Sequence, residues 1–109
     1  MTIGVYTFEI HLPGAQSLKD KRQVLRRLKD RLRSRHNVAV SELEEHTELW
    51  QRAALAVVSV ASRREPLERV FEAVYREARA LVAGEIIDTG TEFIESSDGG
   101  PGGWSEEWG

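Results

Sequence analysis

The apolar residues of this chain change their spacing several times, and the order of these changes constrains the fold more than any other feature. Apolar side chains first alternate, as Tyr6, Phe8 and Ile10 do, which is typical of a strand with one buried face. They then recur every three or four residues, as Leu25 and Leu28 do, which is typical of a helix with one buried side. The predicted strands cover residues 3–12, 37–45, 49–62 and 85–94, and the predicted helices cover residues 17–36 and 66–83.

Particular residues mark the ends of the predicted helices. Ser17 is expected to cap the first helix, because its hydroxyl can accept a hydrogen bond from a free N–H of the first turn. Pro66 suits the first turn of the second helix, and Gly84 suits its C-terminal cap. Residues 53–61 are apolar on both parities, which predicts a central strand. The alternation slips at residues 41–43, which predicts a β-bulge there.

The element order predicts an α+β fold of the ferredoxin-like β-α-β-β-α-β type. Short connections and right-handed crossovers give a four-stranded antiparallel sheet with both helices on one face, so the other face stays open. A chain of 109 residues is long enough for one core. We expect residues 1–95 to form this domain and residues 96–109 to form a glycine-rich linker followed by an acidic tail with Trp104 and Trp108.

Positive charge is concentrated in the first predicted helix. The net charge of the chain is −3, yet residues 17–36 hold nine of its 15 lysines and arginines and only two acidic residues. From Glu85 onward there are seven acidic residues and no basic one. This asymmetry, rather than the total charge, indicates a surface that attracts anions.

Five of these basic residues, which we call the basic stripe, form one line along the helix. Their steps of three and four residues place them on the face away from the leucines. We predict that the stripe and the flanking Lys21 contact nucleic acid, because phosphates along RNA suit such a line of charge. Two alternatives remain open: acidic groups of this chain or of a second copy neutralise the stripe, or it is an ordinary solvated face. The basic stripe consists of Lys19, Arg22, Arg26, Lys29 and Arg33.

The start of the first helix offers a second, more local interpretation. Free backbone amides near Lys19, Lys21 and Arg22 could hold a discrete anion. The favoured interpretation is an ordinary capped helix start whose lysines face water.

Several kinds of chemistry are not expected. The chain has no cysteine, which excludes disulfides, thiol nucleophiles and cysteine-ligated metals. His11, His36 and His46 show no metal-ligand spacing, and no cofactor-binding motif is present. Acyl-phosphate hydrolysis would need an arginine in a phosphate-binding loop; residues 14–16 lack one, and the sole asparagine, Asn37, suits a strand start. We therefore expect a non-enzymatic protein with no catalytic residue, cofactor or metal.

The chain also lacks signals for membranes or secretion. No apolar run approaches the length of a membrane-spanning helix, and the first 12 residues alternate without a basic flank. We expect a cytoplasmic protein with no membrane partner.

At residues 17–22, Ser-Leu-Lys-Asp-Lys-Arg, which follow Leu12-Pro13-Gly14, the chain resembles the YlxP-like family, a bacterial family named only as a domain of unknown function. Residues 37–40, Asn-Val-Ala-Val, and 50–53, Trp-Gln-Arg-Ala, fit the same pattern, and the resemblance covers residues 1 to about 95. Relatives often carry aspartate where this chain has Glu48. The resemblance implies a ferredoxin-like fold and an association with translation, since relatives tend to be encoded beside ribosome maturation and initiation factors. It implies no role for any single residue.

Two expectations about function follow. The first is a non-enzymatic RNA-associated factor in small ribosomal subunit maturation, which would bind phosphate through the first helix. The alternative is a homo-oligomeric interaction module, such as a homodimer, that uses the open sheet face and the tail. In that case Trp104 and Trp108 would serve as apolar anchors.

Overall fold

The computed structural model describes residues 1–44 and 49–96. The predicted tail with Trp104 and Trp108 lies outside these residues, and so does His46. The element order is β-α-β-β-α-β, as predicted. The elements are β1 (Thr2–His11), α1 (Leu18–Arg35), β2 (Ala39–Glu42), β3 (Arg52–Ala61), α2 (Arg64–Leu81) and β4 (Glu85–Glu95).

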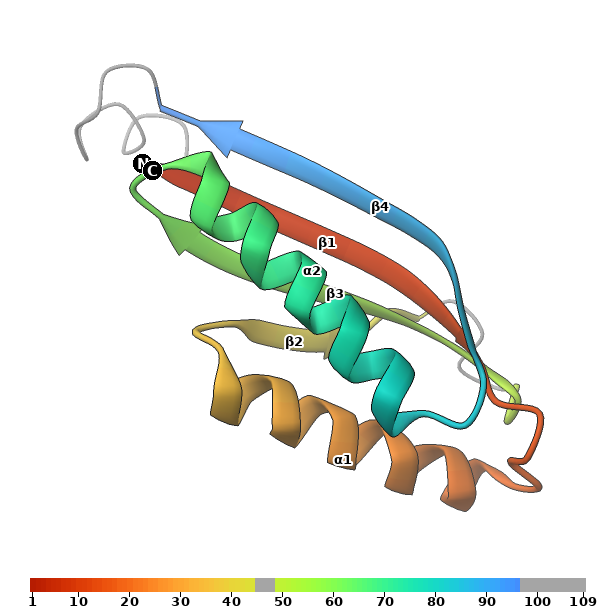
Figure 1. The fold of residues 1–109 in the computed structure, drawn as a ribbon. Coiled ribbons are helices and arrows are strands. Elements are labelled where there is room, and N and C mark those ends of the chain that lie inside the picture. Colours follow the sequence, from red (N-terminus) through yellow and green to blue (C-terminus); the bar gives the residue numbers. More distant parts are fainter. Residues whose placement is uncertain (45–48, 97–109) are drawn as a thin grey trace.

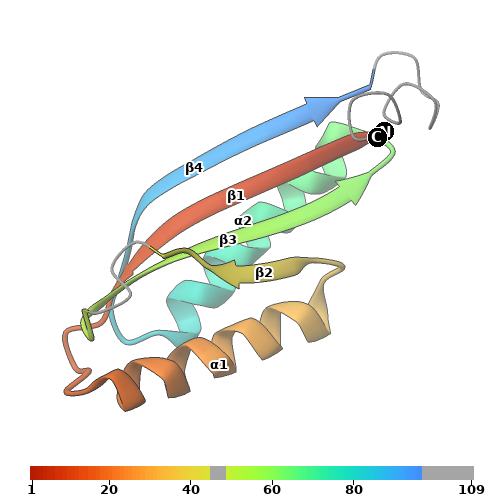
Figure 2. The same ribbon diagram turned by 180° about the vertical axis from the view of Figure 1, so that it is seen from behind.

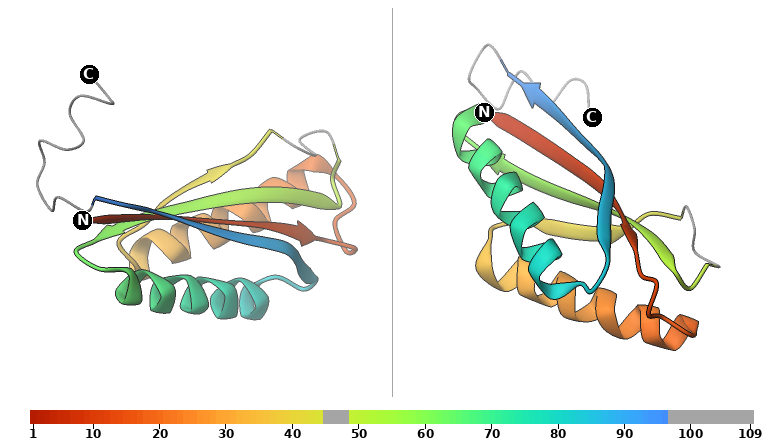
Figure 3. Two further views of the ribbon diagram at one scale, coloured as in Figure 1. Left: turned by 90° about the horizontal axis from the view of Figure 1, so that it is seen from above. Right: turned by 45° about the vertical axis from the view of Figure 1, so that its right-hand side comes forward.

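The four strands form one antiparallel sheet in the order β2-β3-β1-β4. The two helices pack on one face of this sheet (Figure 1). Seen from behind, the sheet lies in front of α2 and presents a face that no described helix covers (Figure 2). Two further views show the twist of the sheet and α2 running beneath it (Figure 3). The predicted ferredoxin-like arrangement is confirmed, and β3 is a central strand as its two-sided apolar pattern indicated.

The core lies between the sheet and the helices. Alternate residues of β1 and β3, such as Phe8 and Leu55, meet one side of each helix there. The helices supply apolar side chains at the predicted spacing, among them Leu28 of α1 and Val74 of α2, and all four of these side chains are at most 2% exposed. Burying an apolar side chain of this size contributes about 1.5–3 kcal/mol, so this layer holds the helices against the sheet.

The predicted helix start at Ser17 is confirmed in detail. The Ser17 hydroxyl accepts a hydrogen bond from the backbone N–H of Asp20 at 3.1 Å. The Asp20 carboxylate accepts one from the backbone N–H of Gln16 at 3.0 Å. These two reciprocal bonds fix the direction in which the chain enters α1.

Two predicted details are wrong. The slip at residues 41–43 is not a bulge, because β2 is a regular strand that ends at Glu42; the register shift lies instead between Thr7 and Glu9, where β1 pairs with β4. Gly84 is not the cap of α2, since that position is held by Val82. Gly84 is required for another reason: a Cβ atom there would lie 1.9 Å from the carbonyl oxygen of His11.

Candidate nucleic-acid interface on helix α1

The basic stripe follows one flank of α1, beside the edge strand β2. Buried Leu25, Leu28 and Leu32 face the core. Arg33 donates a hydrogen bond from Nη2 to the carbonyl oxygen of Val40 in β2 at 3.0 Å. The stripe therefore borders β2. Spacing alone had indicated the face directly opposite the leucines, and the structure places the stripe to one side of that face.

Four of the five stripe residues gather around one shallow groove. The groove encloses about 310 Å³ between α1 and β2. Its apolar wall is Leu25, and its two carboxylates come from Asp30 and Glu42. Lys19 lies nearer the start of α1 and does not line the groove, although it is exposed. The basic residues that line it are Arg22, Arg26, Lys29 and Arg33.

Lys21 does not belong to this surface, and the prediction that it contacts nucleic acid is wrong because its side chain is buried. The residue is only 2% exposed. Its Nζ donates to the carbonyl oxygens of Leu49 at 2.8 Å and Arg52 at 3.3 Å, and lies 3.7 Å from Oε2 of Glu42. The ammonium thus ties α1 to the start of β3. The sequence held a signal for this role, because Lys21 precedes Leu25 by four residues and so shares the buried side of the helix.

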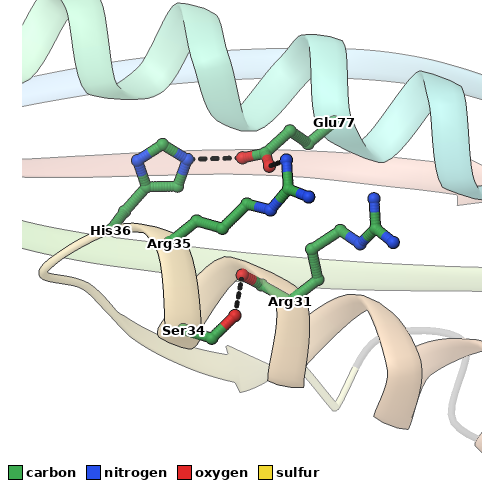
Figure 4. Close-up of polar contacts among 5 residues, drawn as sticks. All are labelled: Arg31, Ser34, Arg35, His36 and Glu77. Carbon is green, nitrogen blue, oxygen red and sulfur yellow. Dashed lines mark hydrogen bonds and ion pairs between the residues drawn. The ribbon is translucent and has the colours of Figure 1, made fainter.

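The stripe carries no ion pair within residues 1–44 and 49–96. The cations that are paired there belong to other surfaces, as Arg52 is with Glu9 of β1. At the end of α1, Arg35 pairs with Glu77 of α2 at 3.1 Å, and His36 contacts the same carboxylate (Figure 4). Arg31 extends toward α2 beside Arg35 without a marked contact to Glu77 (Figure 4). Glu77 of α2 therefore pairs with the C-terminal end of the α1 flank that faces α2, whereas the stripe beside β2 has no such partner among the described residues.

The charge of the stripe costs folding free energy. Successive stripe residues form four pairs of like charge at i,i+3 or i,i+4 spacing, and each pair costs roughly 0.2–0.5 kcal/mol at low salt. Together they oppose folding by roughly 1–2 kcal/mol, less what Asp30 and Glu42 recover. An anion in the groove would reverse the sign of this contribution.

Two of the groups predicted to hold an anion at the start of α1 are already used within the fold. The Ser17 hydroxyl already accepts from the backbone N–H of Asp20, and the Asp20 carboxylate places a negative charge there while it accepts from the backbone N–H of Gln16. Lys21, the central cation of that site, is buried. The geometry favours the capped helix start over the discrete anion site.

The residues considered for acyl-phosphate chemistry are far apart. The loop at residues 14–16 precedes α1, and Asn37 follows it. The 18 residues of α1 separate them by roughly 27 Å along the helix axis. The Asn37 carbonyl accepts a hydrogen bond from the Ser59 hydroxyl at 2.7 Å, which fits its interpretation as a strand-start residue.

The described residues offer neither a metal-binding cluster nor a membrane-spanning helix. Among the residues that the structure describes, no group of three or more histidine, aspartate or glutamate side chains is placed to hold a metal ion. His11 lies on β1, and His36 caps α1. None of the helices in the described part of the chain is long and apolar enough to cross a membrane.

Solved structures of similar shape share the fold. A C-terminal segment of the alpha subunit of aIF2 from Pyrococcus abyssi matches with a TM-score of 0.50 and 19% identity over 89% of this chain, which spans about half (51%) of that segment. SnoaB, a cofactor-independent oxygenase from Streptomyces nogalater, matches with a TM-score of 0.51 and 11% identity, over 87% of this chain and 93% of SnoaB. A de novo designed protein with ferredoxin fold matches with a TM-score of 0.53 and 9% identity, over 89% of this chain and 88% of the design. At these identities the likeness concerns the fold alone.

Sequence comparison identifies the family. The Uncharacterized protein YlxP of Bacillus subtilis (strain 168) is 35% identical over 92 residues, which cover 84% of this chain and 99% of that protein. The family model described as Protein of unknown function (DUF503) matches residues 3–91. The match includes the motif at residues 17–22, so the predicted resemblance is confirmed and the chain belongs to the DUF503 family.

Proposed function

We propose that this protein is a non-enzymatic, cytoplasmic RNA-associated factor that binds phosphates through the basic stripe of α1, with the small ribosomal subunit as its partner during maturation. The observation that carries the proposal is the groove between α1 and β2, where four cations meet two carboxylates. The association with translation that the family resemblance implied supports RNA as the anion. Recognition would rest on charge and shape, because the strands present no row of stacking aromatics comparable to that of an RNA-recognition motif.

The number of stripe residues sets the expected salt dependence. Each phosphate contact to single-stranded RNA contributes a slope of about −0.7 to log K against log salt. Four contacts in the groove predict a slope of about −3. The basic stripe also spans 15 residues, from Lys19 to Arg33, or roughly 21 Å along the helix. That length allows a strand or a groove edge to contact several cations at once.

The test is binding of small-subunit ribosomal RNA fragments across a salt series, measured by fluorescence anisotropy. The triple reversal Arg22→Glu, Arg26→Glu and Lys29→Glu should abolish binding and its salt slope, because it removes three of the four cations in the groove.

The matched control changes the same amount of charge on another surface. Arg63, Arg69 and Arg76 are exposed at and along α2, so their replacement by glutamate alters the net charge equally without touching the groove. This control should retain most of the affinity. Equal loss in both triple variants would mean that net charge alone governs binding, and would refute α1 as the RNA surface.

A second candidate function is a homodimer formed through the open sheet face. Val60, Ile3 and Ile94 lie in one row across β3, β1 and β4 on this face. Val60 is 49% exposed and Ile94 is 42% exposed, and the neighbouring Val58 is 37% exposed. A contiguous apolar row of this kind is typical of a surface that packs against a partner.

The dimer is tested by mass in solution. Val58→Lys with Val60→Lys should convert a dimer to a monomer in light scattering, because it places two charges in the apolar row. Ser41→Lys, on the same face at β2, is the control and should leave the mass unchanged. A monomeric wild-type protein at high concentration would exclude this second function.

A further inference from the structure

A cavity lined by aromatic side chains lies between α2 and β4, away from the basic stripe. It encloses about 520 Å³, a size that suits a small organic ligand. Its aromatic lining comes from Tyr6 of β1, Phe71 and Tyr75 of α2, and Phe93 of β4. Tyr6 and Phe71 stack with ring centroids 5.4 Å apart, and Phe71 and Phe93 are 6.2 Å apart. Three elements thus contribute rings to one aromatic wall.

The hydroxyl of Tyr6 is the most informative group in this cavity. Tyr6 is only 7% exposed, yet its hydroxyl makes no hydrogen bond to any residue that the structure describes. Because Tyr6 lines the cavity, its hydroxyl has room there for a water molecule or a ligand as its partner. Burial, and to a smaller extent the nearby Tyr75 phenol, raises the pKa of Tyr6. The neutral hydroxyl is therefore available to a ligand.

The charges of the lining favour a cation. Glu68 and Glu72, one turn apart on α2, are exposed carboxylates at the rim of the cavity. Arg76 is the one cation among its described lining residues, so the lining itself carries two carboxylates against one guanidinium. Aromatic faces attract cations as well. Two examples are already present at this wall: the Arg64 guanidinium lies 4.3 Å from the centroid of Phe93, and the Arg79 guanidinium lies 5.6 Å from the centroid of Tyr75.

We propose that the cavity between α2 and β4 binds a small organic ammonium compound with an apolar body. The apolar body would lie against the rings of Phe71 and Phe93. The ammonium group would donate to the Tyr6 hydroxyl and face the carboxylates of Glu68 and Glu72. This site is independent of the RNA surface on α1, since the two share no lining residue.

The experiment uses three probes of similar size: phenethylamine, its uncharged analogue 2-phenylethanol, and the anion phenylacetate. The chain has only two tyrosines, Tyr6 and Tyr75, and both line the cavity. NMR signals of ¹³C-labelled tyrosine in the full chain therefore report on this cavity alone. Phenethylamine should shift both signals and bind roughly threefold to tenfold more tightly than 2-phenylethanol, as two exposed carboxylates would allow. Phenylacetate should bind most weakly.

Two sets of variants locate the ammonium group. Glu68→Gln with Glu72→Gln should remove the preference for phenethylamine over 2-phenylethanol. Glu92→Gln changes an exposed carboxylate whose register partner is Val5, on the opposite face of the sheet, and should leave that preference intact. Tyr6→Phe should keep the free protein at least as stable, because the lost hydroxyl bonds to none of the described residues, yet weaken phenethylamine binding roughly tenfold.

Three results would overturn the proposal. They are no tyrosine shift with phenethylamine, equal binding of all three probes, and equal loss of preference in Glu92→Gln and in the Glu68/Glu72 double variant.

Discussion

Replacing Lys21 by methionine separates a structural role from a nucleic-acid role. Methionine keeps an apolar stem of similar length but removes the ammonium that the carbonyl oxygens of Leu49 and Arg52 accept from. Hydrogen bonds to a charged group contribute about 1.5–3 kcal/mol each, and a buried acceptor left without a donor loses a comparable amount. Glu42 loses its ion pair as well, but its side chain is 27% exposed and recovers water. We expect the free energy of unfolding to fall by about 2–3 kcal/mol.

The assay is urea unfolding followed by circular dichroism, with Lys19→Met as the control. Lys19 is an exposed residue of the same helix, so its replacement should change the free energy of unfolding by less than about 0.5 kcal/mol. The two variants should rank the opposite way in affinity for RNA. Lys19→Met should weaken RNA binding, and folded Lys21→Met should bind RNA as the wild type does. A Lys21→Met protein as stable as the wild type would refute the buried tie between α1 and β3.

Two further predictions concern Gly84 and Tyr6. Gly84→Ala should lower the free energy of unfolding by at least about 2 kcal/mol, because its Cβ would meet the His11 carbonyl oxygen at 1.9 Å, whereas Gly14→Ala, with no atom within 4 Å, should be close to neutral in the same urea assay. Burial raises the pKa of Tyr6 above its ordinary value of 10.0, so the folded state resists phenolate formation. The contribution of Tyr6 to the free energy of unfolding is therefore constant below pH 10 and decreases above it. Tyr6→Phe should remove this contribution to the alkaline loss of stability, as measured by urea titrations at several pH values.

The order and type of the elements could be predicted because each has a clear apolar period. The apolar residues of β1 and α2 follow strand and helix spacing over ten and 18 residues respectively, which leaves little ambiguity. β2 was predicted too long, since it has only four residues and offers almost no period to measure. The bulge in β1–β4 pairing was missed because it arises where two distant strands meet, and neither strand alone records it.

The candidate site was predictable only in part. Helical spacing placed the stripe on one line but could not decide which neighbour that line would border. The contact between Arg33 and β2 depends on the docking of α1 beside an edge strand, which is a tertiary property. The aromatic cavity was missed altogether, because Tyr6 on β1 and Phe93 on β4 are separated by most of the chain. Both aromatics follow a core pattern, and what distinguishes the site is that the Tyr6 hydroxyl has no hydrogen-bond partner among residues 1–44 and 49–96.

The two flanks of α1 differ in a way that bears on function. On the flank toward α2, Arg35 and His36 share the Glu77 carboxylate, so the end of this flank has an acidic partner. The flank toward β2 has Asp30 and Glu42 against four cations, and Glu42 also faces Lys21. If charge on α1 served solubility alone, both flanks would be expected to mix their signs, because mixed signs lower the repulsion within the helix. Charge that has no ion-pair partner among the described residues beside β2 suits a surface that meets a polyanion, and this is why we propose the RNA contact on that flank.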